Sequence, residues 1–340
     1  MKLDPFLIGM LAAVGLAFAA PALGADHGPL HMGLVTDLGV GLVFFLHGAA
    51  LSPSALKSGA ANWRLHVFVH ASTYVLFPLL GLAVFFGGGG LLAPEIRLGF
   101  FYLCALSSTI SSSVAMTSLA KGNVPGAVFD ATLSGLLGMV LTPLLLGLVS
   151  VAGAGRLPLL PALAGIGLKL LAPFAAGQAL RVLIAPWLAR HKSLVNRADR
   201  GVILLIVYGA FCNSAAGGLW ARYGYAVVVE ILLLVAALLA TVLTATTLAS
   251  RALGFSRADE VAAVFCGSKK SLANGAPMAK VLFGASPTLG MIVLPLMLYH
   301  QLQLIVCGVL ARRYAARAEA EPAPGRADPG FPAAATSAEY

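Results

Sequence analysis

Charged residues are scarce in this chain of 340 residues: they make up 10% of it, against about 25% in soluble domains. Hydrophobic residues make up 59%. This balance excludes a globular protein with a single membrane anchor and predicts a polytopic membrane protein. Acidic residues are fewer than basic ones, 13 against 22. Because the basic residues lie in loops between apolar stretches, the net charge of +9 does not indicate a nucleic-acid partner.

The motifs of soluble catalysis are also missing. No Walker-type phosphate loop, dinucleotide glycine motif or spaced nucleophile and base occurs in the sequence. We therefore expect neither an enzyme, nor an ATP-driven pump, nor a bound cofactor. Only four cysteines are present, and all lie in apolar stretches without metal-ligand spacing, so we expect buried free thiols. They are Cys104, Cys212, Cys266 and Cys307.

Long apolar runs dominate instead, and ten of them have about the 20 residues needed to cross a bilayer. We predict an all-α protein with transmembrane helices near residues 5–23, 33–52, 66–87, 97–120, 124–150, 158–184, 201–219, 225–250, 259–283 and 287–311. An alternative for the first run is a cleavable signal peptide, but its neutral Met-Lys-Leu-Asp opening favours a retained helix. The Pro-, Ala- and Gly-rich residues 316–340 are predicted to form a disordered cytoplasmic tail after a transporter domain at 1–315.

Lysines and arginines in the loops predict the orientation of the chain. With a cytoplasmic N-terminus, 14 of them lie on the inner side and three on the outer side. Because positive charge accumulates on the cytoplasmic side, we expect an inner-membrane protein with both termini in the cytoplasm. The most basic inner connection is the predicted loop at 189–200.

The ninth predicted helix carries charge where a membrane interior disfavours it. Its ends are apolar, but its middle reads CGSKKS at 266–271, followed by Asn274, Gly275 and Pro277. On insertion scales each central lysine costs roughly 2.5–3.5 kcal/mol. Irregular backbone at this depth persists only inside protein or beside a water-filled cavity. We therefore predict that this helix is broken and forms part of a binding site.

The fourth predicted helix is the counterpart of the ninth in the first half of the chain. Residues 107–113 carry six hydroxyls in seven positions, which on their own could bond to carbonyls of the same helix. Residues 104–125 and 266–287 align at a constant offset of 162 with four identities. Five helices separate the two segments, so we predict inverted five-helix repeats at about 5–150 and 158–312, with two broken helices meeting at the midplane. The alternative is two similar helices without shared ancestry.

Three stretches make the chain resemble the bile acid:sodium symporter family (solute carrier family 10), specifically its member-7-like branch, over nearly all residues to about 315. They are residues 41–68, 106–143 and 264–280. The resemblance implies ten helices in a core and a panel domain, with the fourth and ninth helices broken and crossing in the core. It also implies that substrate binds between the two domains.

The same resemblance bears on sodium. It places Ser112, Ser113, Thr132 and Ser134 near the sodium ligands of the sodium-coupled members. Those members also carry a sodium-binding Glu and a Gln in the ninth helix, where this chain has Phe265 and Lys269. A hard cation prefers oxygen ligands and negative charge, so sodium coupling does not carry over with the family resemblance.

The candidate substrate- or ion-binding residues lie in the fourth, fifth and ninth predicted helices. They are Ser108, Thr109, Ser111, Ser112, Ser113, Asp130, Thr132, Ser134, Ser268, Lys269, Lys270 and Asn274. The lysines are candidates for holding an anion, for replacing a coupling cation with a fixed charge, or for pairing with Asp130. Adjacent helical residues point about 100° apart, so we expect one lysine to face the cavity and favour Lys269.

Asp130 is the nearest candidate for an acidic partner or proton carrier, unless it only favours the positive end of its helix dipole. His66 and His70 lie four residues apart on one helix face, a spacing that suits a metal ion. No third ligand is close in sequence, and we expect no metal site there.

The sequence predicts a secondary active transporter that moves an organic anion by alternating access. One alternative is a proton-coupled cation exchanger in which Asp130 and Lys269 alternate in binding protons. Another is a membrane regulatory protein that does not transport. The expected partners are the lipid bilayer and a small anionic substrate, with homodimer formation left open.

Overall fold

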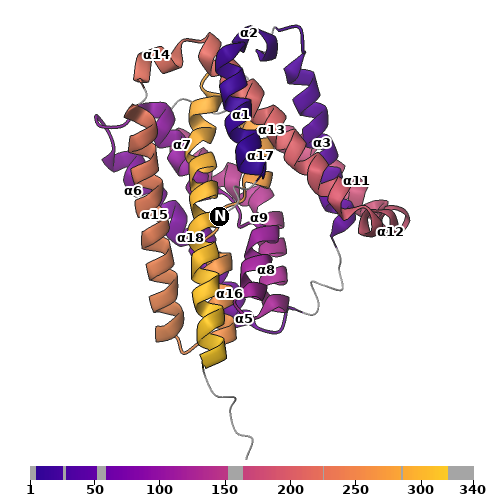
Figure 1. Ribbon diagram of the computed structural model, residues 1–340, viewed down its shortest axis with the longest axis vertical. Coiled ribbons are helices and arrows are strands. Elements are labelled where there is room, and N and C mark those ends of the chain that lie inside the picture. Colours follow the sequence, from indigo (N-terminus) through magenta and orange to yellow (C-terminus); the bar gives the residue numbers. More distant parts are fainter. Residues whose placement is uncertain are drawn as a thin grey trace, which may run out of the picture.

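A computed structural model describes residues 5–25, 28–51, 59–151, 164–224, 226–284 and 286–320, and every regular element in these ranges is a helix (Figure 1). Five of these helices are long and apolar enough to cross a membrane, or up to seven if each of two bent pairs forms one span. The prediction of an all-α protein with several spans is confirmed. Most of the predicted tail lies outside the described residues, and the last helix continues to Ala320.

The helices of the first half are α1 (Pro5–Ala19), α2 (Pro21–Gly24), α3 (Met32–Ala50), α5 (Trp63–Ala71), η1 (Ser72–Leu76), α6 (Phe77–Gly87), α7 (Pro94–Ala105), α8 (Ile110–Leu119) and α9 (Val124–Val151). Those of the second half are η2 (Gly167–Leu171), α11 (Ala172–Ala179), α12 (Arg181–Arg190), α13 (Lys192–Ala216), α14 (Leu219–Tyr223), α15 (Ala226–Ala252), α16 (Arg257–Gly267), α17 (Leu272–Phe283) and α18 (Leu289–Ala320). The elements η1 and η2 are π-helical segments inside longer helices.

Three predicted boundaries need correction. The first predicted span ends early, because Pro21 cannot continue the α-helical hydrogen bonding of α1, which is 15 residues long. The span predicted at 158–184 is described from residue 164 and bends by 89° between α11 and α12. The loop predicted at 189–200 is helical from Lys192, because a basic segment rich in good helix formers does not interrupt a helix.

The helices gather into two groups that share an interface. One group contains α5 to α9 and α15, α16 and α18, with α7 packed between α6 and α18 (Figure 1). The other contains α1, α2, α3, α11 and α13. Helix α13 packs against α17 and α18, where the Ser214 hydroxyl donates to the Pro287 carbonyl at 3.1 Å.

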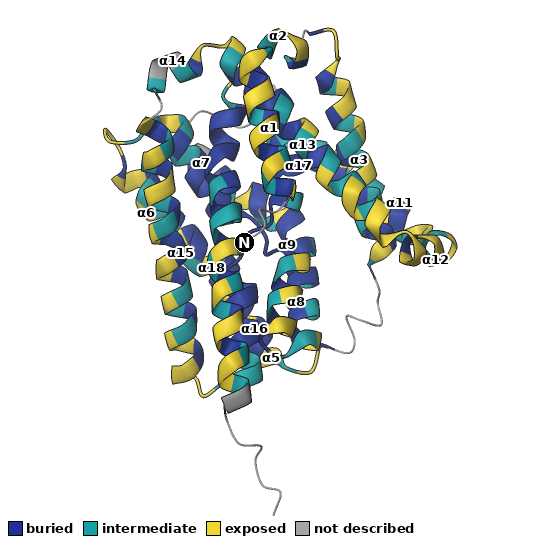
Figure 2. Cartoon of the chain, in the orientation of Figure 1, coloured by how far each residue is buried: buried dark blue, intermediate teal, exposed yellow. Residues whose placement is uncertain are grey.

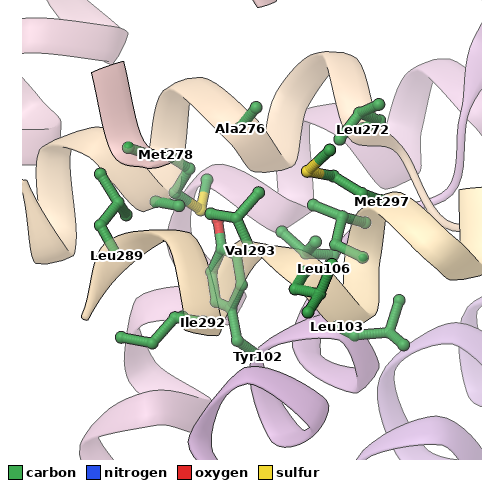
Figure 3. Packing of buried hydrophobic residues seen from close by; sticks show 14 of the residues in the cluster. Tyr102, Leu103, Leu106, Leu272, Ala276, Met278, Leu289, Ile292, Val293 and Met297 are labelled. Carbon is green, nitrogen blue, oxygen red and sulfur yellow. The ribbon is translucent and has the colours of Figure 1, made fainter. Parts of the chain in front are cut away.

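The pattern of burial distinguishes a packed interior from an apolar outer surface of the kind that faces lipid. Buried residues concentrate on the central helices, whereas the outward faces of α1 and α15 are exposed (Figure 2). Large apolar side chains such as Leu11, Leu38 and Leu233 are among the exposed ones. Around the central breaks, the aromatic ring of Tyr102 packs among aliphatic side chains of α7, α17 and α18 (Figure 3). All four cysteines are free and buried, as predicted.

Helices α3 and α11 approach each other through glycines. A Cβ added at Gly177 would lie 2.0 Å from the Phe45 carbonyl oxygen, and one at Gly48 would lie 2.0 Å from the Phe174 carbonyl oxygen. Small residues are the usual means by which membrane helices bring their backbones together. The two backbones are therefore in direct contact.

Replacing Gly177 by alanine is expected to lower the thermal unfolding temperature of the purified protein in detergent. The new methyl group has no space, and overpacking costs about 1–3 kcal/mol. The matched control is Gly15→Ala in α1, because a Cβ there has no atom within 4 Å. Equal unfolding temperatures for the two variants would contradict the close approach.

Candidate functional site

The two predicted helix breaks are present. Helix α7 ends at Ala105 and α8 begins at Ile110, with a bend of 57° between them; α16 ends at Gly267 and α17 begins at Leu272. The unwound segments are therefore 106–109 and 268–271, related by the same offset of 162 residues as the two aligned sequences. These two segments touch, and together they are called the crossing below.

Serines of the first segment and of the start of α8 bind carbonyls at the C-terminal end of α16. The Ser108 hydroxyl donates to the Cys266 carbonyl at 2.7 Å, and the Ser113 hydroxyl donates to the Phe265 carbonyl at 3.1 Å. The last carbonyls of a helix have no partner within it, and buried polar groups require one. The hydroxyl run thus stabilises the end of the other broken helix.

Backbone and amide groups complete the contact between the two segments. The Ser271 N–H donates to the Ser107 carbonyl at 3.0 Å, and the Asn274 side-chain amide donates to the Ser107 hydroxyl at 3.2 Å. The Ser271 hydroxyl also accepts the Asn274 N–H and so caps the N-terminus of α17. Ser268 is fully buried, and its carbonyl accepts from the Tyr299 hydroxyl at 2.6 Å.

The remaining predicted hydroxyl residues divide between the crossing and the surface. The Ser134 hydroxyl of α9 accepts the Ser108 N–H at 2.9 Å and so lies at the crossing. Thr109 and Thr132 are buried. Ser111 is exposed on α8, because it lies on the helix face that points away from the packed interior.

Lys270 places its ammonium group among three backbone carbonyls. Its Nζ donates to the carbonyls of Leu106 at 2.6 Å, Cys104 at 2.8 Å and Thr73 at 3.0 Å. The Nζ also lies 4.0 Å from the centre of the Phe77 ring, a cation–π contact. Since an ammonium group has three N–H donors, these carbonyls occupy all of them.

Lys269 is also fully buried but is differently engaged. Its Nζ donates to the Ser112 carbonyl at 2.8 Å and lies 5.3 Å from the centre of the Phe265 ring. Among the described residues this carbonyl is its one hydrogen-bond acceptor, so two N–H donors remain. Lys269 therefore retains hydrogen-bonding capacity that Lys270 has used.

The ion pairs of Asp130 run to two histidines of α5. One carboxylate oxygen lies 2.8 Å from Nδ1 of His66 and 3.7 Å from Nδ1 of His70. The other oxygen, and Nε2 of His70, are buried without a hydrogen-bond partner among the described residues. The histidine spacing was visible in the sequence. Its acidic partner was not, because Asp130 lies 64 residues from His66.

The residues that the resemblance places near sodium ligands do not fit a sodium ion in this structure. The Ser113 and Ser134 hydroxyls are engaged within the protein, and the Ser112 hydroxyl is buried without a hydrogen-bond partner among the described residues. The Lys269 ammonium donates to the Ser112 backbone carbonyl, so it lies directly beside these residues. The nearby carboxylate of Asp130 is paired with histidines. The Lys269 ammonium therefore lies at a place where a sodium ion would need oxygen ligands and negative charge.

Several apolar helices, with two broken helices in contact at a buried polar centre, indicate a multi-pass membrane protein and are typical of secondary transporters. The chain belongs to the SBF-like CPA transporter family, whose model matches residues 4–316. This confirms the resemblance to the bile acid:sodium symporter type, and transporter membership also disfavours the non-transporting alternative.

Three relatives show the range of the family. An uncharacterized protein of Pseudomonas aeruginosa is 48% identical over 314 residues, which is 92% of this chain and 93% of the relative. YfeH of Escherichia coli is 45% identical over 318 residues, covering 93% and 94% of the two chains. Sodium/bile acid cotransporter 7 of Xenopus tropicalis is 30% identical over 317 residues, covering 91% of each.

Proposed function

We propose that this protein is a secondary active transporter that moves an organic anion across the membrane by alternating access. The observation that carries the proposal is the Lys269 ammonium at the crossing of two broken helices. Its two remaining donors can bind a carboxylate or a similar group, whereas Lys270 has none to offer. Because Lys269 is fully buried, the proposal requires a rearrangement that exposes it to substrate.

The charge balance of the crossing supports an anionic substrate. Two buried ammonium groups of the segment 268–271 bind carbonyls of the first broken helix there, and the ion pairs of Asp130 run to histidines rather than to either lysine. An isolated buried charge is unfavourable unless it is paired. An anion bound at Lys269 would supply the missing negative charge. The relative from Xenopus tropicalis is named for bile acid, which is an organic anion.

The proposal includes the ten-helix arrangement with inverted repeats. The two breaks fall at the same offset as the aligned sequences, which supports related halves of opposite orientation. The loop charges support an inner-membrane location with both termini in the cytoplasm.

The test is a stabilisation screen on purified protein, followed by uptake in proteoliposomes. Cholate, succinate and phosphate serve as probes, each with sodium or with choline as the counterion. A ligand that binds the folded state raises the unfolding temperature, and we expect this for at least one organic anion. An anion that stabilises the protein but is never taken up or exchanged would contradict transport.

A second candidate function is proton-coupled cation exchange. It is supported by the Asp130 carboxylate, which has one buried oxygen without a hydrogen-bond partner among the described residues and lies beside His66 and His70. On this reading the proton carrier is Asp130 with its histidines, rather than Asp130 with Lys269. Sodium or potassium flux driven by a pH gradient, and abolished by Asp130→Asn, would favour exchange over anion transport.

A further inference from the structure

We infer that the Lys270 ammonium is a tethered cation that takes the place of a metal ion at the crossing, so that the protein works without a bound alkali-metal ion. That Lys270 occupies a cation site is inferred from the structure alone. That transport needs no bound alkali-metal ion rests in addition on the proposed function. Three backbone carbonyls surround the Nζ of Lys270.

Each carbonyl is free for a separate reason that can be traced in the sequence. The Thr73 carbonyl lies in a π-helical segment, where the Phe77 N–H bonds instead to the Ser72 carbonyl. The next residue is Pro78, which has no N–H to donate. The Thr73 carbonyl therefore accepts no hydrogen bond within its own helix and is available to Lys270.

The other two carbonyls belong to the C-terminal end of α7. In a continuous helix the Cys104 carbonyl would accept the Ser108 N–H, but that N–H donates to the Ser134 hydroxyl. The Leu106 carbonyl lies in the unwound segment itself. Carbonyls at a helix C-terminus carry partial negative charge, which favours a cation. Three converging carbonyls of this kind are an oxygen site for a monovalent cation.

The Lys270 backbone is held so that its side chain reaches this site. The Gln303 side chain of α18 accepts the Lys270 N–H at 2.9 Å and donates to the Lys270 carbonyl at 2.9 Å. Gln303 is fully buried. Both peptide groups of an unwound residue are thus bound by one amide, which fixes the position from which the side chain extends.

A tethered cation differs from a coupling ion in one respect: it cannot leave. A metal-coupled site loses its ion during each transport cycle, whereas the Lys270 side chain stays attached to the chain in every state. The carbonyl site is therefore occupied whether or not sodium is present. This agrees with the presence of the Lys269 ammonium beside Ser112, where the resemblance places sodium ligands.

The test compares the wild-type protein with Lys270→Ala and uses Lys169→Ala as control. Lys169 is half-exposed and pairs with Asp37 at 2.7 Å, so it shares the residue type but not the site. We expect the wild-type unfolding temperature to be the same in sodium chloride and in choline chloride. Lys270→Ala should unfold at a lower temperature, and propylammonium or sodium chloride should raise it relative to choline chloride, because either cation can enter the vacated carbonyl site.

Two results would overturn the inference. One is specific stabilisation of the wild-type protein by sodium, or stoichiometric binding of radioactive sodium to it in equilibrium dialysis. The other is a folded Lys270→Ala protein that responds to neither cation. If Lys270→Ala does not fold, sodium binding to the wild-type protein still decides the question.

The sodium dependence of transport is measured separately. Uptake of an anion identified in the stabilisation screen should be equal in sodium and choline buffers, and at least a severalfold dependence on sodium would overturn the inference. Absence of any anion transport, together with the expected cation responses, would instead reject the proposed function and leave the tethered cation in place.

Discussion

Lys269→Gln is expected to weaken the binding of an anionic substrate by roughly tenfold to a hundredfold. Hydrogen bonds to a charged group contribute about 1.5–3 kcal/mol, and about 1.4 kcal/mol corresponds to a factor of ten. Glutamine keeps a donor for the Ser112 carbonyl but loses the positive charge. The measurement is the concentration of the anion that gives half-maximal stabilisation or half-maximal uptake.

The control for this prediction is Lys169→Gln, which removes a half-exposed lysine outside the crossing. It should leave the affinity unchanged. Wild-type affinity in a folded Lys269→Gln protein would show that the anion binds elsewhere, and the proposed role of Lys269 would be wrong.

Gln303→Leu is expected to destabilise the protein strongly. Leucine has a similar size but can neither accept the Lys270 N–H nor donate to the Lys270 carbonyl. Each buried polar group left without a partner costs about 1–3 kcal/mol, so the two together cost about 2–6 kcal/mol. Thermal unfolding in detergent measures the effect.

The matched control is Gln301→Leu, two residues earlier on α18. Gln301 is partly exposed, and its side-chain amide makes a 3.6 Å contact with the sulfur of Met10. Because a long contact to a thioether is weak, this substitution should change the unfolding temperature little. If Gln301→Leu destabilised the protein as much as Gln303→Leu, the effect would belong to α18 in general and not to Lys270.

The sequence was sufficient to predict the membrane-spanning character and the positions of both helix breaks. Apolar runs define helices because the bilayer imposes both their length and their composition. The breaks were predictable because Lys269, Lys270 and the hydroxyl run at 107–113 are unfavourable in hydrocarbon, and such residues mark irregular, protein-enclosed backbone. The predicted cavity-facing role of Lys269 stays a prediction, supported by its unused donors.

The individual contacts of the site were not predictable from the chain alone. Lys270 binds the Thr73 carbonyl across 197 positions of sequence, and that carbonyl is free because of a local π-helical segment and Pro78. His66 meets Asp130 across 64 positions. A residue type limits which partners are suitable, but only the packing of distant helices decides which suitable partner is within reach.

The reciprocal hydrogen bonding at the crossing has a mechanical consequence. Ser108 and Ser113 bind carbonyls of α16, and Lys270 binds the Cys104 carbonyl of α7 and the Leu106 carbonyl that follows it, so each broken helix binds free backbone groups of the other. Separating them would expose several unsatisfied groups at once. Under the proposed function, we therefore expect a movement that uncovers Lys269 to carry both broken helices together. The contacts of α13 with α17 and α18, including the hydrogen bond from the Ser214 hydroxyl to the Pro287 carbonyl, are then the ones we expect to change in such a movement.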